Sequence, residues 1–425
     1  MARQGNKRTV YVYAHWKGMP EPVCMGFLYS ERLRGNEVFS FEYKKDWLKQ
    51  GPSQLLDPGL QLYPGLHYQN GEQKNFGIFL DSSPDRWGRM LMRRREAALA
   101  RVENRTEEKL FETDYLLGVY DGHRMGALRF KLDEDGPFLN DNRALASPPW
   151  TSIGELEQAS LRLEEEDVID DPEYFKWLRM LVDPGASLGG ARPKASIQER
   201  DGSLWIAKFP SRSDPGDSGG WEIVTHELAL AAGITMAESK VQKFSSNYYT
   251  FLTKRFDRTG RGERLHFASA MTLLGYEDGQ DHTDGASYLD LVEFITTHGA
   301  NVDRDLEELW RRIVFSICTS NADDHLRNHG FLLSEGGWLL SPAYDLNPVE
   351  TASALKLNIS DTDNALDLDL ALDVSAYFRL GDERASEIIS EVKSAVRNWK
   401  SVATRYKIPG SEQELKAMAF QRAEI

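Results

Sequence analysis

Asn321-Ala-Asp-Asp-His-Leu-Arg-Asn328 is the most informative segment of this 425-residue chain. It places two carboxylates, a histidine and two carboxamides within eight residues, a mixture that solvation alone does not require. Before this segment, from Leu306 to Ser320, apolar residues recur at helical spacing. After it, an apolar run extends from Gly330 to Leu333. This pattern predicts a loop of reactive side chains that begins where a helix ends.

The spacing within this loop matches the catalytic loop of protein kinases. In that loop an aspartate accepts the proton of the substrate hydroxyl, and an asparagine five residues later binds a magnesium ion. Asp323 and Asn328 have this separation. A kinase needs a second metal-binding aspartate, and Asp345 is the candidate, because the apolar stretches before it predict a hairpin that returns the chain to the loop. We therefore expect Asp323 to be the catalytic base, and Asn328 and Asp345 to bind Mg²⁺.

A kinase also requires a lysine on a strand, paired with a glutamate from the next helix, to bind the α- and β-phosphates. The stretch Leu204-Trp-Ile-Ala-Lys208-Phe predicts such a strand and supplies Lys208. Glu222 stands at the head of a helical stretch that ends near Gly233, and we expect it to pair with Lys208; Glu227 is the less favoured choice. A lone lysine on a strand usually faces solvent, so this assignment depends on the rest of the set.

A glycine-rich segment, Gly185-Ala-Ser-Leu-Gly-Gly-Ala-Arg-Pro-Lys194, comes shortly before that strand. Its glycines would let backbone amides approach phosphate oxygens. It follows neither the dinucleotide-binding pattern nor the Walker pattern, because Ala191 stands where the Walker lysine would be. The segment is either a phosphate-binding loop or a flexible turn, and its place before Lys208 favours the loop.

The rest of the chain predicts an α+β protein with more than one domain. Short alternating stretches from Thr9 to Tyr43 indicate strands, whereas the spacing from about Ser83 to Tyr120 indicates helix, with Pro84 just inside the helix start. We expect an N-terminal α+β domain over residues 1–150 and a bilobal, protein-kinase-like core over 151–425. Within that core, a nucleotide-binding lobe extends to about residue 255, and a mainly helical catalytic lobe follows.

Charge and cysteine content exclude several other classes of protein. The formal net charge of −15 would repel phosphate backbones, so direct nucleic-acid binding is disfavoured. The two cysteines, Cys24 and Cys318, follow no disulfide or zinc-binding spacing. No apolar run reaches the length of a signal sequence or a membrane span. We expect a cytoplasmic protein that does not associate with membranes.

Taken together, these motifs resemble the HipA family, the serine/threonine kinase toxins of bacterial toxin–antitoxin modules. The resemblance covers nearly the whole chain. It is carried, in chain order, by Phe76 to Gly88, Tyr115-Leu-Leu with Gly126-Ala-Leu, Gly189 to Lys194, Lys254 to Arg258, Asn321 to Asn328, and Ala343-Tyr-Asp345.

The resemblance implies a HipA-like fold, with ATP and Mg²⁺ as cofactors, and gives Asp323, Asn328, Asp345 and Lys208 the same roles as above. It also implies an ATP site made of Gly189, Gly190, Ala191, Arg192, Pro193, Lys194, Lys208, Lys254, Arg255, Phe256, His325, Arg327, Asn328, Tyr344 and Asp345. Within it, Lys254 to Phe256 would form the hinge that faces the adenine. Kinases of this type can phosphorylate a serine of their own glycine-rich loop as an off-switch, and Ser187 occupies that position.

The resemblance further implies a small HipB-like helix-turn-helix antitoxin as partner. That partner would contact the operator DNA, which this acidic chain would reach only indirectly. The implied protein substrate is a translation factor or an aminoacyl-tRNA synthetase, whose phosphorylation stalls translation and promotes persistence. The sequence does not identify the target.

Three other functions remain open at this stage. A metal-dependent phosphohydrolase could use Asp323, Asp324, His325 and Asp345 as ligands, although it would leave Lys208 unexplained. A catalytically silent co-repressor or scaffold could act with the antitoxin. A third possibility is a kinase whose acceptor is a small-molecule or lipid hydroxyl.

Overall fold

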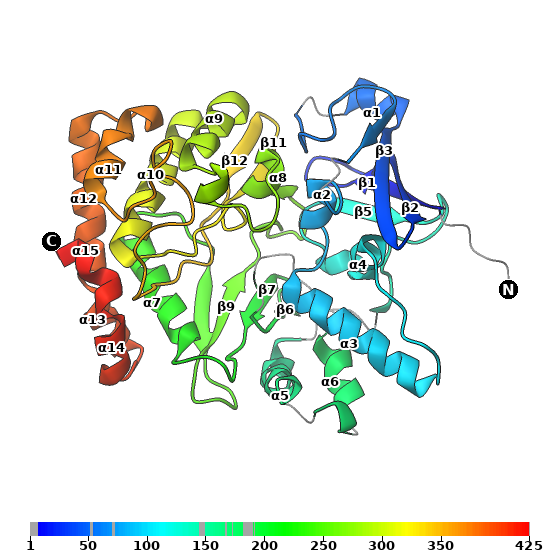
Figure 1. Cartoon of the computed structure of the whole chain (residues 1–425), viewed down its shortest axis with the longest axis horizontal. Helices are drawn as coiled ribbons and strands as arrows, with labels where there is room; N and C mark the ends of the chain where they lie inside the picture. The colour runs from blue at the N-terminus through cyan, green and yellow to red at the C-terminus, as the bar shows by residue number, and fades with distance from the viewer. Residues whose placement is uncertain are drawn as a thin grey trace. The chain divides into compact units, whose positions relative to one another are not determined.

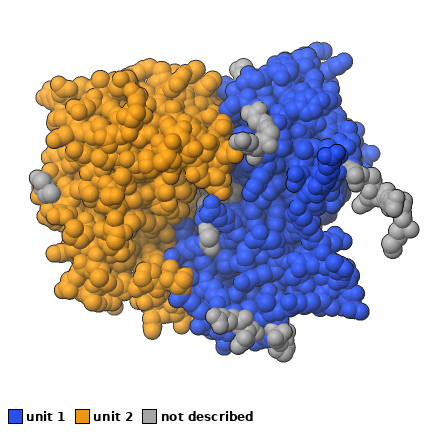
Figure 2. All heavy atoms as spheres, in the orientation of Figure 1, with its two compact units in different colours: residues 1–212, 257–268 blue, residues 213–256, 269–425 orange. Residues whose placement is uncertain are grey.

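The computed structural model describes residues 7–51, 54–69, 73–143, 149–165, 168–171, 173–181, 190 and 192–424. The chain divides into two compact units, which Figure 2 shows in separate colours. The first unit comprises Met1–Arg212 and Asp257–Ala268, and the second comprises Ser213–Phe256 and Ser269–Ile425. Helices and strands occur in both units, which confirms the expected α+β class. The domain boundaries near residues 150 and 255 stay predictions.

A five-stranded antiparallel sheet opens the first unit (Figure 1). Its strands lie in the order β4-β3-β2-β1-β5, with bounds β1 Lys7–Ala14, β2 Val23–Leu33, β3 Asn36–Tyr43, β4 Leu66–Tyr68 and β5 Leu128–Lys131. Inward-facing side chains such as Val10, Val12 and Phe41 are fully buried, as the alternating sequence predicts. The ring of Phe79, from helix α2 (Gly77–Asp81), packs against Phe41 and Phe130 of this sheet. The β-rich opening is therefore confirmed.

The helical region predicted from Ser83 to Tyr120 consists of two helices rather than one. Helix α3 spans Arg86–Val102 and α4 spans Glu112–Gly118, with the segment between them outside any helix. Pro84 lies before the helix start instead of inside it, because the Asp85 side chain caps α3 by accepting a hydrogen bond from Gly88 N at 2.9 Å. The position of Pro84 is a correction to the sequence-based expectation.

Further helices and a second hairpin complete the first unit. The helices are α1 Lys45–Gln50, α5 Ile153–Leu163 and α6 Tyr174–Leu181, and the short 3₁₀ turns are η1 Asp121–His123, η3 Trp150–Ser152 and η4 Val168–Asp170. Strands β6 (Lys194–Gln198) and β7 (Leu204–Lys208) form an antiparallel hairpin in which Lys194 stands opposite Lys208. The strand predicted around Lys208 is confirmed.

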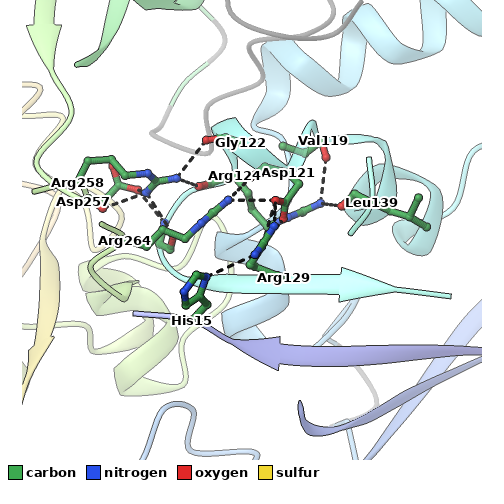
Figure 3. A network of polar contacts seen from close by, with 11 residues as sticks. His15, Val119, Asp121, Gly122, Arg124, Arg129, Leu139, Asp257, Arg258 and Arg264 are labelled. Carbon is green, nitrogen blue, oxygen red and sulfur yellow. Dashed lines mark hydrogen bonds and ion pairs between the residues drawn. The ribbon is translucent and has the colours of Figure 1, made fainter. Parts of the chain in front are cut away.

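Residues 257–268 belong to the first unit although the second unit flanks them in sequence. Buried charges hold them there, as Figure 3 shows. The Asp257 carboxylate, fully buried, accepts hydrogen bonds from Gly126 N at 2.9 Å and from the Arg258 guanidinium at 2.6 Å. Arg264 donates to the carbonyl of Asp121 and forms an ion pair with its carboxylate at 3.3 Å. This segment is thus anchored to the η1–β5 region.

Arg124 is the centre of the same polar network (Figure 3). Its side chain is fully buried, and the guanidinium donates four hydrogen bonds of 2.8–3.0 Å to backbone carbonyls, those of Ser82, Leu116, Val119 and Leu139. Burial lowers the pKa of Arg124 to about 10, so the side chain keeps its charge at neutral pH. One arginine therefore fixes the loops around α4 and β5.

The second unit is mainly helical and contains two hairpins (Figure 1). Its helices and turns are α7 Ser218–Ala231, α8 Ala270–Leu274, η5 His282–Asp284, α9 Tyr288–His298, α10 Val302–Thr319, α11 Leu368–Asp373, η6 Ser375–Phe378, α12 Asp382–Val396, α13 Trp399–Arg405, α14 Gly410–Lys416, η7 Ala417–Phe420 and α15 Gln421–Glu424. The hairpins pair β8 Ser239–Gln242 with β9 Thr250–Lys254, and β11 Gly330–Ser334 with β12 Gly337–Leu340. The short strand β10 spans Phe267–Ser269, where the chain passes from the first unit to the second.

Helix α10 forms the core of the second unit, as the apolar spacing from Leu306 predicts. Leu306, Leu309, Ile313 and Ile317 are fully buried, and α12 packs along α10 with Ile388 and Val392. Helix α12 ends at Val396, and Trp399 begins α13. Among the described residues, no helix is both long and apolar enough to cross a membrane.

Candidate active site

The predicted catalytic loop begins where α10 ends. Ser320 follows the last helical residue with a φ of 51°, in the left-handed region, and this conformation turns the chain out of the helix. The next residue, Asn321, is fully buried, and its backbone N–H still donates to the Ser316 carbonyl at 2.9 Å. The loop therefore leaves from a fixed point on the core helix.

Within the loop, a hydrogen bond joins Asp323 and Asn328. The Asn328 side-chain amide donates to the Asp323 carbonyl at 2.9 Å, and the backbone N–H of His325 donates to the same carbonyl at 3.0 Å. The Asp323 side chain is exposed, whereas Asn328 is buried. The loop thus offers the Asp323 carboxylate to solvent, where a substrate hydroxyl could meet it.

The side-chain oxygen of Asn328 fits the predicted role of a metal ligand. Because the amide nitrogen is bonded to the Asp323 carbonyl, the oxygen Oδ1 is turned away from it. In the part of the chain that the structure describes, this buried oxygen has no hydrogen-bond partner. Leaving a buried acceptor without a partner is costly, and a neutral oxygen is a ligand that Mg²⁺ accepts.

The turn that carries Asp345 is tied to the catalytic loop on both sides. Before it, the Tyr344 hydroxyl donates to the Arg327 carbonyl at 2.8 Å. After it, the backbone N–H of Asn347 donates to the Asn321 side-chain oxygen at 3.1 Å. Asp345 itself has a φ of 60°, unusual for a residue with a side chain and frequent at functional turns. The hairpin β11–β12 returns this turn to the loop, as the sequence predicts.

Asp324, the neighbour of Asp323, has a buried side chain with partners inside the protein. Its carboxylate, 2% exposed, accepts a hydrogen bond from the Tyr288 hydroxyl at 2.5 Å and lies 3.0 Å from His329 Nε2. Burial alone would raise the pKa of Asp324, but His329 and Tyr288 more than offset it, so the pKa lies below its usual value. These contacts leave Asp324 poorly placed to bind a metal, which counts against the phosphohydrolase reading.

Of the other residues of the predicted ATP site in the second unit, Phe256 and Arg327 make contacts near the catalytic loop or on it. The ring of Phe256 packs against that of Tyr344, with centroids 5.6 Å apart, and the Arg327 guanidinium pairs with Asp278 at 3.3 Å. Lys254 closes β9, and its ammonium donates to Glu238 at 3.0 Å, whereas the Arg255 side chain is buried. Phe256 is therefore brought to the Asp345 turn.

Lys208 and Glu222 lie in different units, so their pairing stays a prediction. Lys208 closes β7 with its side chain 8% exposed, and Glu222 lies inside α7 with 6% exposed. The less favoured choice, Glu227, has its carboxylate bonded by Arg405 and Tyr406. That engagement removes Glu227 as a convincing partner for Lys208.

The glycine-rich segment is described only at its end. Ser187, Gly189 and Ala191 lie outside the described residues, while Gly190 has a φ of 91° that favours glycine. The Arg192 guanidinium donates to the Phe209 carbonyl at 3.1 Å, and Phe209 N donates to the Pro193 carbonyl at 2.9 Å. The Lys194 ammonium forms a buried ion pair with Asp85 at 2.6 Å, which the sequence analysis did not anticipate.

Comparison with known proteins decides the family. The family model of the HipA-like C-terminal domain matches residues 186–399, half of the chain. This chain belongs to the HipA-like family. The match includes the catalytic loop, the Asp345 turn and both lysines, Lys194 and Lys208.

Relatives of this HipA-like chain are similar at low identity. It is 25% identical over 281 residues to the serine/threonine-protein kinase toxin HipA of Shewanella oneidensis, which covers 58% of this chain and 61% of that relative. The chain spans about half to three fifths of the length of the curated relatives it matches. A solved complex of Shewanella oneidensis HipA, HipB and operator DNA contains a chain with a TM-score of 0.65 at 17% identity, covering 98% of this chain and 96% of that one. This likeness confirms the expected HipA-like fold.

Proposed function

We propose that this HipA-like chain is an ATP-dependent serine/threonine protein kinase. One observation carries the proposal: an exposed Asp323 and a buried Asn328, whose side-chain oxygen is available, share one loop that two hydrogen bonds tie to the Asp345 turn. Phosphoryl transfer depends on positioning and charge stabilisation more than on covalent chemistry, so a fixed constellation of this kind is what the reaction needs.

Each proposed site residue of the second unit then has a defined role. Asp323 would accept the proton of the substrate hydroxyl as that oxygen bonds to the γ-phosphorus, while the bond from the γ-phosphorus to the bridging oxygen breaks and ADP leaves. Asn328 Oδ1 and the Asp345 carboxylate hold Mg²⁺. Phe256, packed against Tyr344, provides an apolar face for the adenine. When bound, ATP with Mg²⁺ supplies the transferred phosphoryl group and the charge that neutralises its oxygens.

In the first unit, Lys208 and Lys194 supply positive charge for the phosphates, and Glu222 orients Lys208. The phosphate acceptor is a serine or threonine of a protein, such as a translation factor or an aminoacyl-tRNA synthetase, in the cytoplasm. Ser187 is a second acceptor, and its phosphorylation switches the kinase off because the added negative charge repels the phosphates of ATP.

The experiment that tests this proposal is intact-mass measurement and phosphopeptide mapping after incubation with ATP and Mg²⁺. Wild type is compared with Asp323→Ala and Ser187→Ala. We expect one added phosphate on Ser187 in wild type and none in either variant. Phosphate on another residue, lost in Asp323→Ala, would support the kinase and contradict the Ser187 switch. Absence of any phosphate in wild type, despite ATP binding, would contradict the Ser187 switch and favour a silent co-repressor.

We also propose that the chain acts with a HipB-like antitoxin. The solved Shewanella oneidensis relative is a complex with HipB and operator DNA. The net charge of −15 makes direct contact with operator DNA unfavourable for this chain. Gel-shift assays should therefore show that the purified chain does not retard operator DNA alone but further retards the antitoxin–operator complex. Retardation by the chain alone would contradict this division of labour.

A further inference from the structure

The ion pair between Asp85 and Lys194 connects a motif near the N-terminus to the end of the glycine-rich segment. The Lys194 ammonium lies 2.6 Å from Asp85 Oδ2 and also donates to the Gly190 carbonyl at 3.3 Å. The two side chains are only 2% and 1% exposed. Both residues belong to the first unit, where Figure 1 shows the start of α3 beside β6.

Asp85 is held rigidly at this position. Its second carboxylate oxygen, Oδ1, accepts a hydrogen bond from Gly88 N at 2.9 Å and caps α3. The positive end of the helix dipole also favours a carboxylate there. The carboxylate therefore has one orientation, and the lysine that it binds must come to it.

The first turn of α3 holds Lys194 at a second point. The Trp87 indole N–H donates to the Lys194 carbonyl at 3.1 Å. The ammonium and the backbone of Lys194 are thus both bound by residues of one short sequence, Ser83-Pro-Asp-Arg-Trp-Gly88. A contact to the backbone as well as to the side chain fixes the path of the chain at Lys194.

On its other side, the same segment is held by the strand that carries Lys208. Lys194 stands opposite Lys208 in the β6–β7 pairing. Arg192 and Pro193 exchange hydrogen bonds with Phe209, the residue after Lys208. The end of the glycine-rich segment is therefore clamped between the start of α3 and the end of β7.

Net stability alone does not account for a buried ion pair. Taking two charges out of water costs as much as their attraction returns, or more, so a buried ion pair is weak evidence for added stability. Here the arrangement concerns the two lysines that are proposed to bind the phosphates. A displaced Lys194 would also affect Lys208, which stands opposite it in the β6–β7 pairing.

We propose that Asp85 is a positioning residue for nucleotide binding: through the ion pair with Asp85 and the hydrogen bond from Trp87, the start of α3 sets the position of Lys194 and, across the β6–β7 pairing, that of Lys208, the two lysines proposed to bind the phosphates of ATP. This inference rests on the proposed kinase function. It gives the motif around Asp85 a role in the nucleotide site, although Asp85 does not itself contact the nucleotide.

The test measures the dissociation constant of ATP with Mg²⁺ by calorimetry on the full chain. Asp85→Asn keeps an oxygen that can cap α3 but removes the negative charge, so ATP affinity should fall at least tenfold. Lys194→Met should weaken affinity to a similar or greater extent. The double variant Asp85→Asn/Lys194→Met removes both charges of this ion pair. It should bind ATP no more weakly than Lys194→Met, because Asp85 acts through Lys194.

Two further variants separate positioning from general damage. Asp57→Asn alters another buried aspartate of the first unit, whose carboxylate accepts hydrogen bonds from the backbone of Gly59 and Ile78, and it should leave ATP affinity within twofold of wild type. Trp87→Phe removes the hydrogen bond to the Lys194 carbonyl and keeps an aromatic ring, although a smaller one, at this buried position, and it should weaken ATP binding about threefold. Trp87→Phe also decides the matter if Asp85→Asn does not fold.

Each outcome bears on one proposal or the other. If wild type binds no ATP, the kinase function fails and this inference fails with it. If wild type binds ATP but Asp85→Asn or Trp87→Phe binds equally well, only the inference is overturned. It is also overturned if the effects of Asp85→Asn and Lys194→Met multiply, or if Asp85→Asn binds ATP more tightly, since the pair would then compete with the nucleotide.

Discussion

The Arg422 guanidinium donates a hydrogen bond to the Ser320 hydroxyl at 2.9 Å, across 102 residues of sequence. The same hydroxyl donates to the Ala419 carbonyl at 2.8 Å, and Val349 N donates to the Ser320 carbonyl at 3.2 Å. Ser320 has a left-handed backbone conformation between α10 and the catalytic loop. Residues near the C-terminal end therefore hold the point from which Asp323 is presented.

Replacing Arg422 with alanine should lower kcat about tenfold or more and leave the dissociation constant of ATP unchanged. The physical reason is that the loop loses its fixed origin, and small misplacements of a catalytic group are costly. Steady-state kinetics and calorimetry together measure the two quantities. Arg405→Ala is the matched control, because Arg405 pairs with Glu227 instead of with the loop. An unchanged kcat in Arg422→Ala would contradict the role of this contact.

The two adjacent aspartates of the loop should respond in opposite ways to the same substitution. Asp323→Asn removes an exposed carboxylate, so transfer should be abolished while the free energy of unfolding changes by less than about 0.5 kcal/mol. Asp324→Asn removes the buried partner of His329 and Tyr288, and it should cost roughly 3 kcal/mol of stability. Urea unfolding and phosphate transfer on both variants provide the comparison. Loss of stability in Asp323→Asn would show that the buried and exposed roles are reversed.

Local sequence patterns were sufficient to predict the helix, hairpin and strand that carry the candidate site residues. The helical spacing before Ser320, the hairpin before Asp345 and the strand at Lys208 are all confirmed, because each depends on a few neighbouring residues. The spacing from about Ser83 to Tyr120 indicated helix, but apolar spacing alone does not show that α3 ends at Val102 and that α4 begins at Glu112.

The contacts that hold the site in place were missed for a different reason. Tyr288 lies 36 residues before Asp324, and Asp85 lies 109 residues before Lys194. Pairs this distant leave no periodicity in the sequence, and only folding brings them together. Asp85 lies within the motif from Phe76 to Gly88 that supports the family resemblance, so a role for it could be suspected. Its partner Lys194 could not be predicted from the sequence.

Stability should depend on pH through His266, a histidine buried in the first unit. Burial lowers its pKa to about 4, below the 6.5 of an exposed histidine. The unfolded chain therefore binds a proton between these values that the folded chain does not. Stability is fully present above about pH 6.5 and is lost as the pH falls toward 4, by roughly 3 kcal/mol.

His266→Phe should remove this part of the pH dependence. Phenylalanine can keep the stacking on Trp16, whose ring lies 5.4 Å from that of His266. The measurement is the free energy of unfolding in urea at several pH values from 4 to 8. The variant should show a shallower slope below pH 6.5 and a curve parallel to wild type above pH 7. Equal slopes in both proteins would contradict the assignment to His266.

Arg124→Lys should destabilise the first unit by roughly 3 kcal/mol or more. An ammonium cannot reach the four carbonyls that the guanidinium binds, and each buried carbonyl left without a donor costs about 1–3 kcal/mol. Arg162→Lys is the control on the surface of the same unit, where the side chain is 57% exposed and pairs with Glu165. That change should stay within about 0.5 kcal/mol. A small effect of Arg124→Lys on the urea midpoint would mean that water replaces the lost donors.

The dependence of phosphate transfer on Mg²⁺ concentration should show whether Asn328 binds the metal. Asn328→Ala removes the oxygen proposed to hold Mg²⁺, so the Mg²⁺ concentration for half-maximal transfer should rise at least tenfold. It also removes the hydrogen bond to the Asp323 carbonyl, which by itself would lower kcat without changing the metal requirement. Asn328→Asp separates the two effects, because a carboxylate still binds metal but donates no hydrogen bond. We expect Asn328→Asp to have a reduced kcat and a near-normal Mg²⁺ requirement, whereas equal metal requirements in all three proteins would show that Asn328 orders the loop and binds no metal.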